Sequence, residues 1–263
     1  MTVNLLLTND DGVASPFLHA LVRALRDDGH TLFVVAPASE QSWIGCAKSR
    51  RRHVASAVVD LGLGVPTWSV DGTPSDCVSI GLAHLLPADA AIEGVVSGIN
   101  VGRNASLGFI LASGTIAGAW EGAVHGLPGL AFSLDLTREA FEAYHANPSR
   151  PSDEVHSSLT HAARHAARLT PDLVRLTPRQ SFVVHNVNFP LPCSPVTAVR
   201  RTVPARVIVP GLFTPAADDG THRFIFNLGR DLSPAEPLTD RAALDAGLIS
   251  HTVLDYTAIG RPA

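Results

Sequence analysis

Two adjacent carboxylates follow the first apolar run of the chain, in the stretch Asn9-Asp10-Asp11-Gly12. Like charges placed side by side repel each other, and burying them is costly unless a cation offsets the charge. Hard divalent cations such as Mg²⁺ take carboxylate oxygens as ligands. The pair therefore indicates either a cation site or a turn whose acids precede a helix.

Two loops further along the chain carry groups that suit a cation or a phosphate. Segment 36–45 contains the hydroxyl of Ser42, and the glycine-containing segment 97–104 contains the amides of Asn100 and Asn104. An amide oxygen can ligate a metal, and an amide NH₂ can donate to a phosphate. Taken singly, both loops are equally typical of ordinary turns.

A third segment, Ser113-Gly114-Thr115, begins a predicted helix. The free N–H groups at a helix start and the helix dipole attract anions, and the two hydroxyls add further donors. The alternative is an ordinary serine cap.

The elements that must position these groups follow from hydrophobic periodicity. Residues 3–8 and 31–36 read as buried strands, and 15–28 between them places its apolar residues on one helix face and ends at Gly29. This strand–helix–strand unit predicts an α/β fold with a mostly parallel sheet in a Rossmann-like three-layer body.

The same periodicity predicts the remaining elements. They are short strands at 54–59 and 66–70, a helix from Pro74 capped by Thr73 and Asp76, a strand at 92–96, a loop over 97–112, a helix at 113–125, a strand at 129–134, a helix at 151–170 and a strand at 181–187. We divide the chain into a catalytic body, 1–195, and a β-rich hairpin and C-terminal arm, 196–263, within one domain.

Ligands of open α/β sheets bind outside the carboxyl ends of the strands, and all the segments above lie at such ends. Together they predict a site for phosphoryl transfer that holds one divalent ion, Mg²⁺ or Mn²⁺. The expected metal ligands are Asp10, Asp11, Ser42 and Asn100. The expected phosphate contacts are Asn104, Ser113, Gly114 and Thr115.

Composition narrows the class of protein. Hydrophobic residues make up 46% and charged residues 17%, with a net charge of −4, which is typical of a globular chain and not of a nucleic-acid binder. Arg50-Arg51-Arg52 is interpreted as a solvated patch. The three cysteines have no CxxC spacing, which argues against a disulfide framework and a structural zinc site. The sequence shows no signal-peptide pattern and no apolar run long enough to span a bilayer. We therefore predict a cytoplasmic protein that does not insert in a membrane.

Several of these motifs together resemble the SurE (survival protein E) family. The resemblance runs from residue 3 to about 257 and rests on NDDG, VVAP with QS, GTPSDCV, SGINVGRN, SGTIAGAWEG and TDRAALDAGLISHTVLDYT. It implies a metal-dependent phosphatase that hydrolyses nucleoside 5′- and 3′-monophosphates, with some activity on short polyphosphate. It also implies the metal and phosphate residues named above, and a hairpin and C-terminal arm that assemble a homodimer or homotetramer.

Two departures from the family lie near the expected nucleoside. Many members have Ser-Gly where this chain has Ser42-Trp43, and the loop between Asn104 and Ser113 lacks the acidic pair typical of the family and is one residue longer. Trp43 is interpreted as a hydrophobic plug or interface residue, or alternatively as a platform for the base. The preferred nucleotide, the native metal and the oligomeric state are left open by the sequence.

The sequence leaves alternative functions for the protein and alternative roles for some residues open. A dinucleotide-dependent oxidoreductase is disfavoured because the first turn lacks GxGxxG, and a non-catalytic receiver-like module or a broad phosphatase or exopolyphosphatase stays possible. If the protein is a phosphatase, Asp11 orients or deprotonates a metal-bound water, or Asp10 attacks phosphorus directly.

Two further groups of residues have alternative interpretations. Arg103 either neutralises phosphate or faces solvent. A metal site on His156, His161 and His165 is disfavoured.

Overall fold

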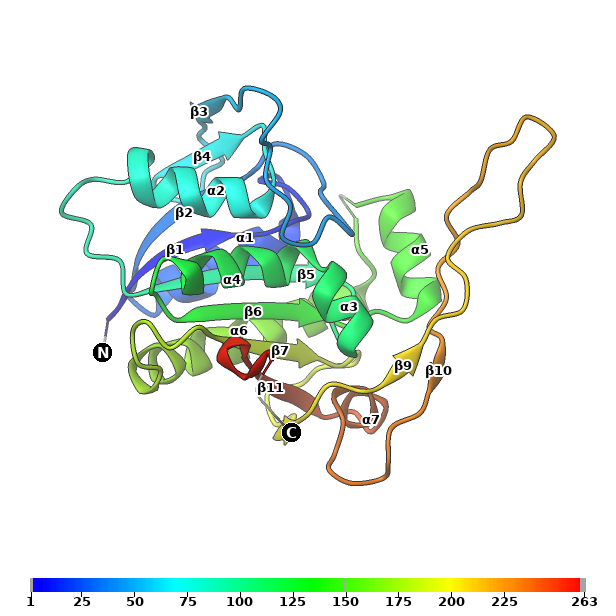
Figure 1. The fold of residues 1–263 in the computed structure, drawn as a ribbon. Coiled ribbons are helices and arrows are strands. Elements are labelled where there is room, and N and C mark those ends of the chain that lie inside the picture. Colours follow the sequence, from blue (N-terminus) through cyan, green and yellow to red (C-terminus); the bar gives the residue numbers. More distant parts are fainter. Residues whose placement is uncertain (1, 149, 261–263) are drawn as a thin grey trace.

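A nine-stranded sheet forms the centre of the part of the chain that the computed structural model describes, residues 2–148 and 150–260 (Figure 1). In sheet order the strands are β3 (Ser56–Val58), β4 (Thr67–Val70), β2 (Thr31–Pro37), β1 (Asn4–Thr8), β5 (Gly94–Val101), β6 (Gly129–Leu134), β7 (Val183–Phe189), β11 (Ile249–Asp255) and β8 (Val199–Thr202). The run from β4 to β7 is parallel, and β3 and β11 are antiparallel to their neighbours β4 and β7. The predicted mostly parallel sheet is confirmed.

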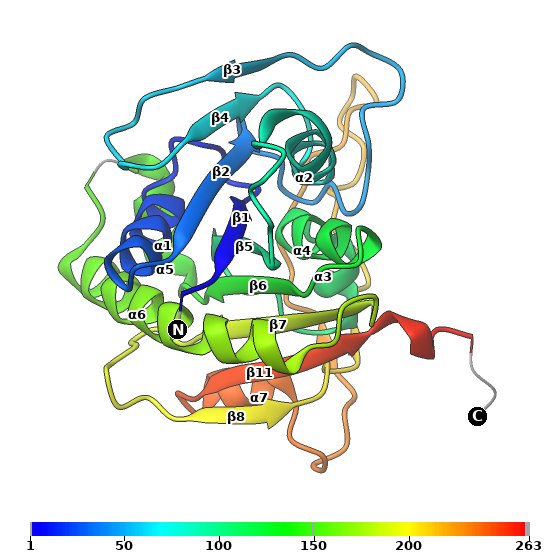
Figure 2. The same cartoon turned by 90° about the vertical axis from the view of Figure 1, so that its left-hand side faces the viewer.

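Helices cover both faces of this sheet, as Figure 2 shows. One layer holds α1 (Pro16–Asp27), α5 (Arg138–Ala146) and α6 (Asp153–Leu176), and the other holds α2 (Pro74–Ile80), α3 (Leu107–Ala112) and α4 (Gly114–Val124). A π-helical turn, Gly81–Leu85, continues α2. Along β1, Leu5 and Leu7 belong to the core under α1, whereas Leu6 packs on the opposite face. Side chains alternate across a strand, so β1 contributes to both cores of the three-layer body.

Short sequence patterns determine where the helices that flank the site begin and which face they bury. Helix α1 buries the residues expected from its periodicity, Phe17, Leu18, Leu21, Val22 and Leu25. At the start of α2, the Thr73 hydroxyl accepts from the Asp76 N–H while the Asp76 carboxylate accepts from the Thr73 N–H. The predicted capping box is therefore confirmed.

The predicted loop 97–112 is wrong over most of its length. Strand β5 continues to Val101, and residues 107–112 form α3. Glycine and asparagine in SGINVGRN favour a loop, but Asn100 and Val101 pair with Ser133 and Leu134 of β6 after a shift in register. Pairing with a buried neighbour outweighs the weak strand propensity of these residues.

The chain beyond residue 195 returns to the main sheet before it ends. Between β8 and α7 (Asp240–Asp245) a long excursion, the arm (residues 203–239), leaves the body and carries only the two-residue strands β9 (Val207–Ile208) and β10 (Arg230–Asp231). Strand β11 and the 3₁₀ turn Tyr256–Ala258 follow. Sequence periodicity identified the arm as hairpin-like but missed α5, α7 and β11, and the division at 195 and 196 stays a prediction.

None of the helices within residues 2–148 and 150–260 is both long and apolar enough to cross a membrane.

Candidate active site

The two carboxylates lie where β1 ends, and groups from other segments hold both of them. The carbonyl oxygen of Asp10 accepts a hydrogen bond from the Gln41 N–H at 2.7 Å. Its Oδ1 accepts another from the Thr115 hydroxyl at 2.5 Å. The Oδ2 of Asp11 accepts from the Val101 N–H at 3.1 Å. All three other segments that the sequence marked as ligand-binding therefore meet at this aspartate pair.

Burial governs the protonation of the pair. Asp10 is only 3% exposed, and burial raises its pKa to about 6 because a low-dielectric environment disfavours the charged form. Burial, followed by the charge of Asp10, raises the pKa of Asp11 well above its usual value. In the described ranges no lysine or arginine forms an ion pair with either carboxylate. The buried Asp10 and the partly buried Asp11 thus have no cationic side chain paired with them in the described ranges.

The start of α4 lies directly against Asp10. A Cβ added to Gly114 would come within 2.8 Å of the Asp10 Cβ, so only glycine permits this approach. Ser113 caps the helix by accepting a hydrogen bond from the Ile116 N–H at 3.1 Å. The Thr115 hydroxyl, predicted to contact phosphate, donates to Asp10 in this structure. Its observed role is to orient the carboxylate, and its contact with phosphate stays a prediction.

The two other predicted metal ligands lie on neighbouring loops. The Asn100 side-chain NH₂ donates to the Gly102 carbonyl at 2.7 Å, so the amide oxygen is the atom left for a ligand. Ser42 is exposed, and its loop is joined to the end of α3 by a bond from the Gly45 N–H to the Ala112 carbonyl at 2.9 Å. The structure brings these loops to the same sheet edge as the aspartates, as predicted.

Asn104 belongs to a buried amide network. Its NH₂ donates to the Ser133 hydroxyl at 3.0 Å, and its N–H donates to the Asn188 Oδ1 at 2.8 Å. Its carbonyl oxygen accepts from the amides of Asn186 and Asn188. Sequence analysis missed both β7 asparagines, although two asparagines two residues apart in an apolar strand signal a buried polar network, because such groups must find hydrogen-bond partners. The network fixes the backbone beside the site.

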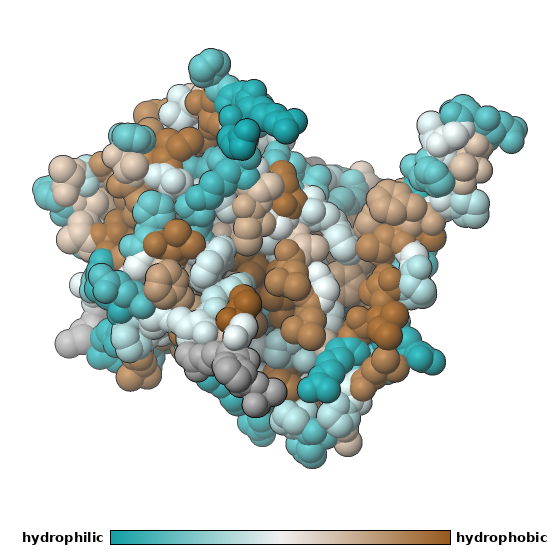
Figure 3. Space-filling view, viewed as in Figure 1, coloured by the Kyte–Doolittle hydropathy of each residue, from teal (hydrophilic) through white to brown (hydrophobic). Residues whose placement is uncertain are grey.

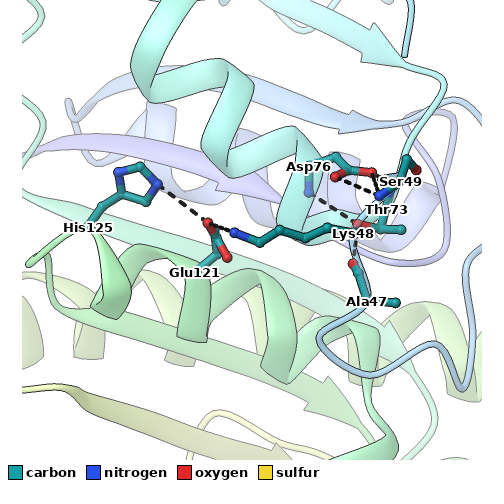
Figure 4. Close-up of polar contacts among 7 residues, drawn as sticks. All are labelled: Ala47, Lys48, Ser49, Thr73, Asp76, Glu121 and His125. Carbon is teal, nitrogen blue, oxygen red and sulfur yellow. Dashed lines mark hydrogen bonds and ion pairs between the residues drawn. The ribbon is translucent and has the colours of Figure 1, made fainter. Parts of the chain in front are cut away.

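An ion pair between a half-exposed lysine and a buried glutamate joins the loop after β2 to α4 (Figure 4). The Lys48 Nζ lies 2.6 Å from the Oε1 of Glu121, whose side chain is 4% exposed, and the Nε2 of His125 lies 3.4 Å from the same oxygen. A buried carboxylate needs such a partner because desolvation of an unpaired charge is expensive. Neither Lys48 nor Glu121 was predicted as a site residue, although Glu121 lies within the SGTIAGAWEG motif.

A second set of contacts in Figure 4 fastens the same loop to α2. The Ser49 N–H donates to the Asp76 carboxylate at 3.2 Å, and the Thr73 hydroxyl donates to the Ala47 carbonyl at 2.8 Å. We call residues 38–53 the strap, because this segment without regular secondary structure crosses from the end of β2 over the starts of α2 and α4. The cap residues of α2 therefore also hold the strap that carries Ser42.

Comparison with known proteins agrees with this arrangement. The family model described as survival protein SurE matches residues 5–208. The chain belongs to the SurE family. A protein named 5′-nucleotidase SurE from Desulforudis audaxviator is 33% identical over 268 residues, which cover 98% of this chain and 95% of that protein. A protein of the same name from Nitratidesulfovibrio vulgaris is 36% identical over 262 residues, covering 95% and 86% of the two chains.

The fold of this SurE family member is also similar to a solved structure. The crystal structure of the SurE protein from Aquifex aeolicus superposes with a TM-score of 0.73 at 26% sequence identity, and the match covers 97% of this chain and 93% of that one. The resemblance drawn from NDDG and the later motifs is confirmed, and so is the fold class.

Trp43 distinguishes this SurE chain within its strap. Its backbone has φ of 60°, a left-handed conformation that glycine adopts without strain and that costs a bulky residue about 1 kcal/mol or more. The indole centroid lies 5.4 Å from that of Phe109 in α3 and 5.1 Å from that of Phe224 in the arm. These contacts fit the plug interpretation in part, but the side chain stays 41% exposed.

The solvent-facing interpretation of Arg103 is wrong, whereas its contact with phosphate stays a prediction. Its guanidinium forms two bonds of 2.8 Å with the carboxylate of Asp135, and its side chain is 17% exposed. A paired arginine at this depth does not face solvent freely, and its Nη1 has no hydrogen-bond partner among the described residues. The planar guanidinium matches a carboxylate bidentately, so the pair joins the ends of β5 and β6 beneath the site.

The histidines of α6 form no metal site. His165 is buried, with its Nε2 2.8 Å from the Ser194 carbonyl oxygen. Across the described ranges, no group of three or more histidine, cysteine, aspartate or glutamate side chains is arranged to hold a metal ion. A cation at the aspartate pair would need neutral oxygen ligands as well, which is the kind of donor that Ser42 and Asn100 provide.

Proposed function

We propose that this SurE chain is a metal-dependent phosphoric monoester hydrolase that converts nucleoside 5′-monophosphates to nucleoside and inorganic phosphate. The observation that carries the proposal is the contact between Asp10 and the start of α4. It places buried carboxylates, which call for a cation, beside a helix start, which attracts an anion. The names of the relatives support the same enzyme class and substrate.

The residues present fit a divalent cation. Raised pKa values for the buried Asp10 and the partly buried Asp11, with no cationic side chain paired to either, mean that an added positive charge would stabilise their charged forms. Asp10, Asp11, Ser42 and Asn100 would hold the ion, and all of them offer hard oxygen donors. When bound, Mg²⁺ or Mn²⁺ supplies Lewis acidity and charge neutralisation to the phosphoryl group.

The chain's own groups then bind and orient the substrate. The N–H groups at the start of α4 and the Ser113 hydroxyl bind phosphoryl oxygens, while the Thr115 hydroxyl keeps Asp10 in place. Asp11 has its Oδ2 held by the Val101 N–H, so its Oδ1 is the atom that takes a proton from the attacking water. The water oxygen bonds to phosphorus as the P–O5′ bond breaks. O5′ leaves with the bonding pair and takes up the proton that Asp11 accepted, which returns Asp11 to its carboxylate form.

A covalent route through Asp10 is the alternative chemistry. In that route a carboxylate oxygen of Asp10 bonds to phosphorus as the P–O5′ bond breaks, and the nucleoside O5′ leaves with the bonding pair and takes a proton from water. Water then hydrolyses the acyl phosphate to inorganic phosphate and the free carboxylate. Rapid acid quench of a single turnover separates the routes, because only the covalent one leaves phosphate on the protein.

Release of inorganic phosphate from AMP or GMP tests the proposal. We expect release with Mg²⁺ or Mn²⁺ and none after EDTA treatment. Phosphate release that EDTA leaves unchanged would remove the metal from the proposal. No release under any condition would favour a non-catalytic module, and nicotinamide-cofactor binding without release would favour an oxidoreductase. Including 3′-monophosphates and polyphosphate in the panel tests the broader activities expected of the family.

Assembly and location are further proposals. The arm exposes apolar side chains, including Phe213 at 61% and Phe226 at 59%, which supports a homodimer or homotetramer built through the arm. All three cysteines are free, which supports the cytoplasm as the location. Light scattering of the purified chain tests the first point, and cell fractionation tests the second.

A further inference from the structure

Trp43 lies between two parts of the proposed phosphate site. It follows Ser42 directly, and its ring contacts Phe109, which precedes the α4 cap Ser113 by one helical turn. The bond from the Gly45 N–H to the Ala112 carbonyl holds the strap against this turn. The indole therefore belongs to the segment that lies against the turn before α4, next to the proposed phosphate-binding residues.

Three aromatic rings from two distant parts of the chain gather around this indole. Phe109 comes from α3, and Phe224 and Phe226 come from the arm, with centroids 5.1 Å and 6.4 Å from Trp43. Phe109 and Phe226 also contact each other at 5.8 Å. Figure 3 shows hydrophobic surface extending from the region of α3 to the base of the arm. We call these four residues the aromatic wall.

The aromatic wall does not cover the indole completely. Trp43 retains 41% exposure, although three rings contact it and although its backbone adopts a conformation better suited to glycine. A residue needed only to fill space would be enclosed by its neighbours. An exposed ring held in a strained conformation instead indicates a surface kept open for another planar group.

We propose that Trp43 stacks on the base of the nucleoside monophosphate, with the other three residues of the aromatic wall supporting it. This inference rests on the proposed nucleotidase function and adds the site for the base. Every base has a π face, and stacking on aromatic side chains is tolerant of base identity. The wall therefore favours nucleotides over phosphate esters that lack a base and discriminates only weakly between purines.

The experiment compares two ligands in matched variants. AMP reports on both the phosphate and the base, whereas inorganic phosphate, a competitive product inhibitor, reports on the phosphate site alone. Trp43→Gly removes the ring and suits the positive φ, so the strap keeps its conformation. Trp43→Phe retains an aromatic face, and Trp68→Phe in β4 is the control for loss of an indole elsewhere.

We expect Trp43→Gly to lower kcat/KM for AMP about tenfold, equivalent to about 1.4 kcal/mol, and to leave the inhibition constant of phosphate within about twofold. Trp43→Phe should retain at least about a third of the activity, and Trp68→Phe should match the parent.

An AMP effect below about twofold in Trp43→Gly would overturn the proposal, as would an equal loss of AMP turnover and phosphate affinity, which would make Trp43 a support for the strap alone. A change of oligomeric state with unchanged AMP kinetics would assign the ring to contact between copies of the chain. Failure of the nucleotidase proposal would look different, because the parent chain itself would release no phosphate.

Discussion

The sheet-edge site and the arm are built in opposite ways. Around Asp10 every identified polar contact is short and buried, and Thr115 is fully enclosed. The arm contains strands of only two residues and two isolated bridges, Val203 with Thr239 and Phe213 with Phe224, and it exposes large apolar side chains. Phosphoryl transfer needs groups held in fixed positions, because preorganised dipoles need no rearrangement during the reaction. The exposed apolar side chains of the arm, by contrast, can complete their packing when a base or a second subunit binds to them.

The contrast also concerns charge. The site concentrates carboxylates, amides and helix dipoles, whereas the part of the arm nearest to it presents aromatic rings. Trp43 belongs to the strap, and the strap connects the two regions through Lys48 and Glu121 on one side and Phe224 on the other. Changes in the site should therefore affect chemistry most, changes in the strap should affect both regions, and changes in the arm should affect assembly most.

The largest expected effect is that of Asp10→Asn on activity. The variant loses one charge and one proposed ligand, so kcat/KM for AMP should fall at least about 10³-fold. Its melting temperature in EDTA at pH 8 should equal or exceed that of the parent. The raised pKa of Asp10 means that the folded parent is destabilised as pH rises from about 4 through about 6, and asparagine removes that penalty.

The stability gain of Asp10→Asn over the parent should therefore grow between pH 4 and pH 7 in EDTA. Thermal unfolding across this range measures it. Near-parental activity of the variant would break the assignment of the chemistry to the sheet edge, and a constant stability difference would show that Asp10 titrates normally.

Thr115→Val should have the next largest effect. Valine has nearly the same shape but lacks the hydroxyl that donates to the Asp10 Oδ1. Loss of one charge-assisted hydrogen bond is worth about 1.5–3 kcal/mol, so kcat/KM should fall by roughly ten- to a hundredfold. Steady-state kinetics with saturating Mg²⁺ measure the change, and Thr115→Ser, which keeps the hydroxyl, is the control. Equal rates in the valine and serine variants would contradict an orienting role.

The ion pair in the strap predicts an asymmetry in stability. Lys48→Met leaves the buried Glu121 carboxylate with only the Nε2 of His125, 3.4 Å away, whereas Glu121→Gln leaves the half-exposed side chain of Lys48 free to meet water. Lys48→Met should therefore cost more, about 1–2 kcal/mol in the free energy of unfolding, because desolvation falls on the unpaired buried charge. Urea unfolding of both single variants and the double variant tests this. Equal costs, or a double variant worse than Lys48→Met, would contradict it.

The smallest effect on the body is expected from Phe213→Ser in the arm. This side chain is 61% exposed and contacts Phe224, so its loss should change the melting temperature of the body by less than about 2 °C. If the arm joins copies of the chain, the variant should shift the species seen in light scattering toward monomer. An unchanged oligomer with a strongly lowered melting temperature would show instead that the arm stabilises the body.

Sequence patterns predicted the body of the fold well, because its elements obey simple periodicities. β1, α1 and β2 begin and end within a residue of the predicted limits, and the capping box of α2 is where Thr73 and Asp76 placed it. The meeting of Asp10, Asp11, Asn100 and the start of α4 also followed from the sequence. In a parallel sheet all carboxyl ends share one edge.

Other features depended on contacts that no local pattern encodes. Residues 97–101 form a strand because β6 pairs with them, and Arg103 is paired because Asp135 ends the neighbouring strand. Lys48 and Glu121 lie 73 positions apart, and Trp43 meets Phe224 only because the arm folds back toward the strap. The amino-acid sequence by itself thus determined which segments carry the chemistry, through strand ends and helix starts. Only the tertiary structure decided which side chains pair with, orient and cover the groups in those segments. These partners are far apart in the sequence and come together only when the chain folds.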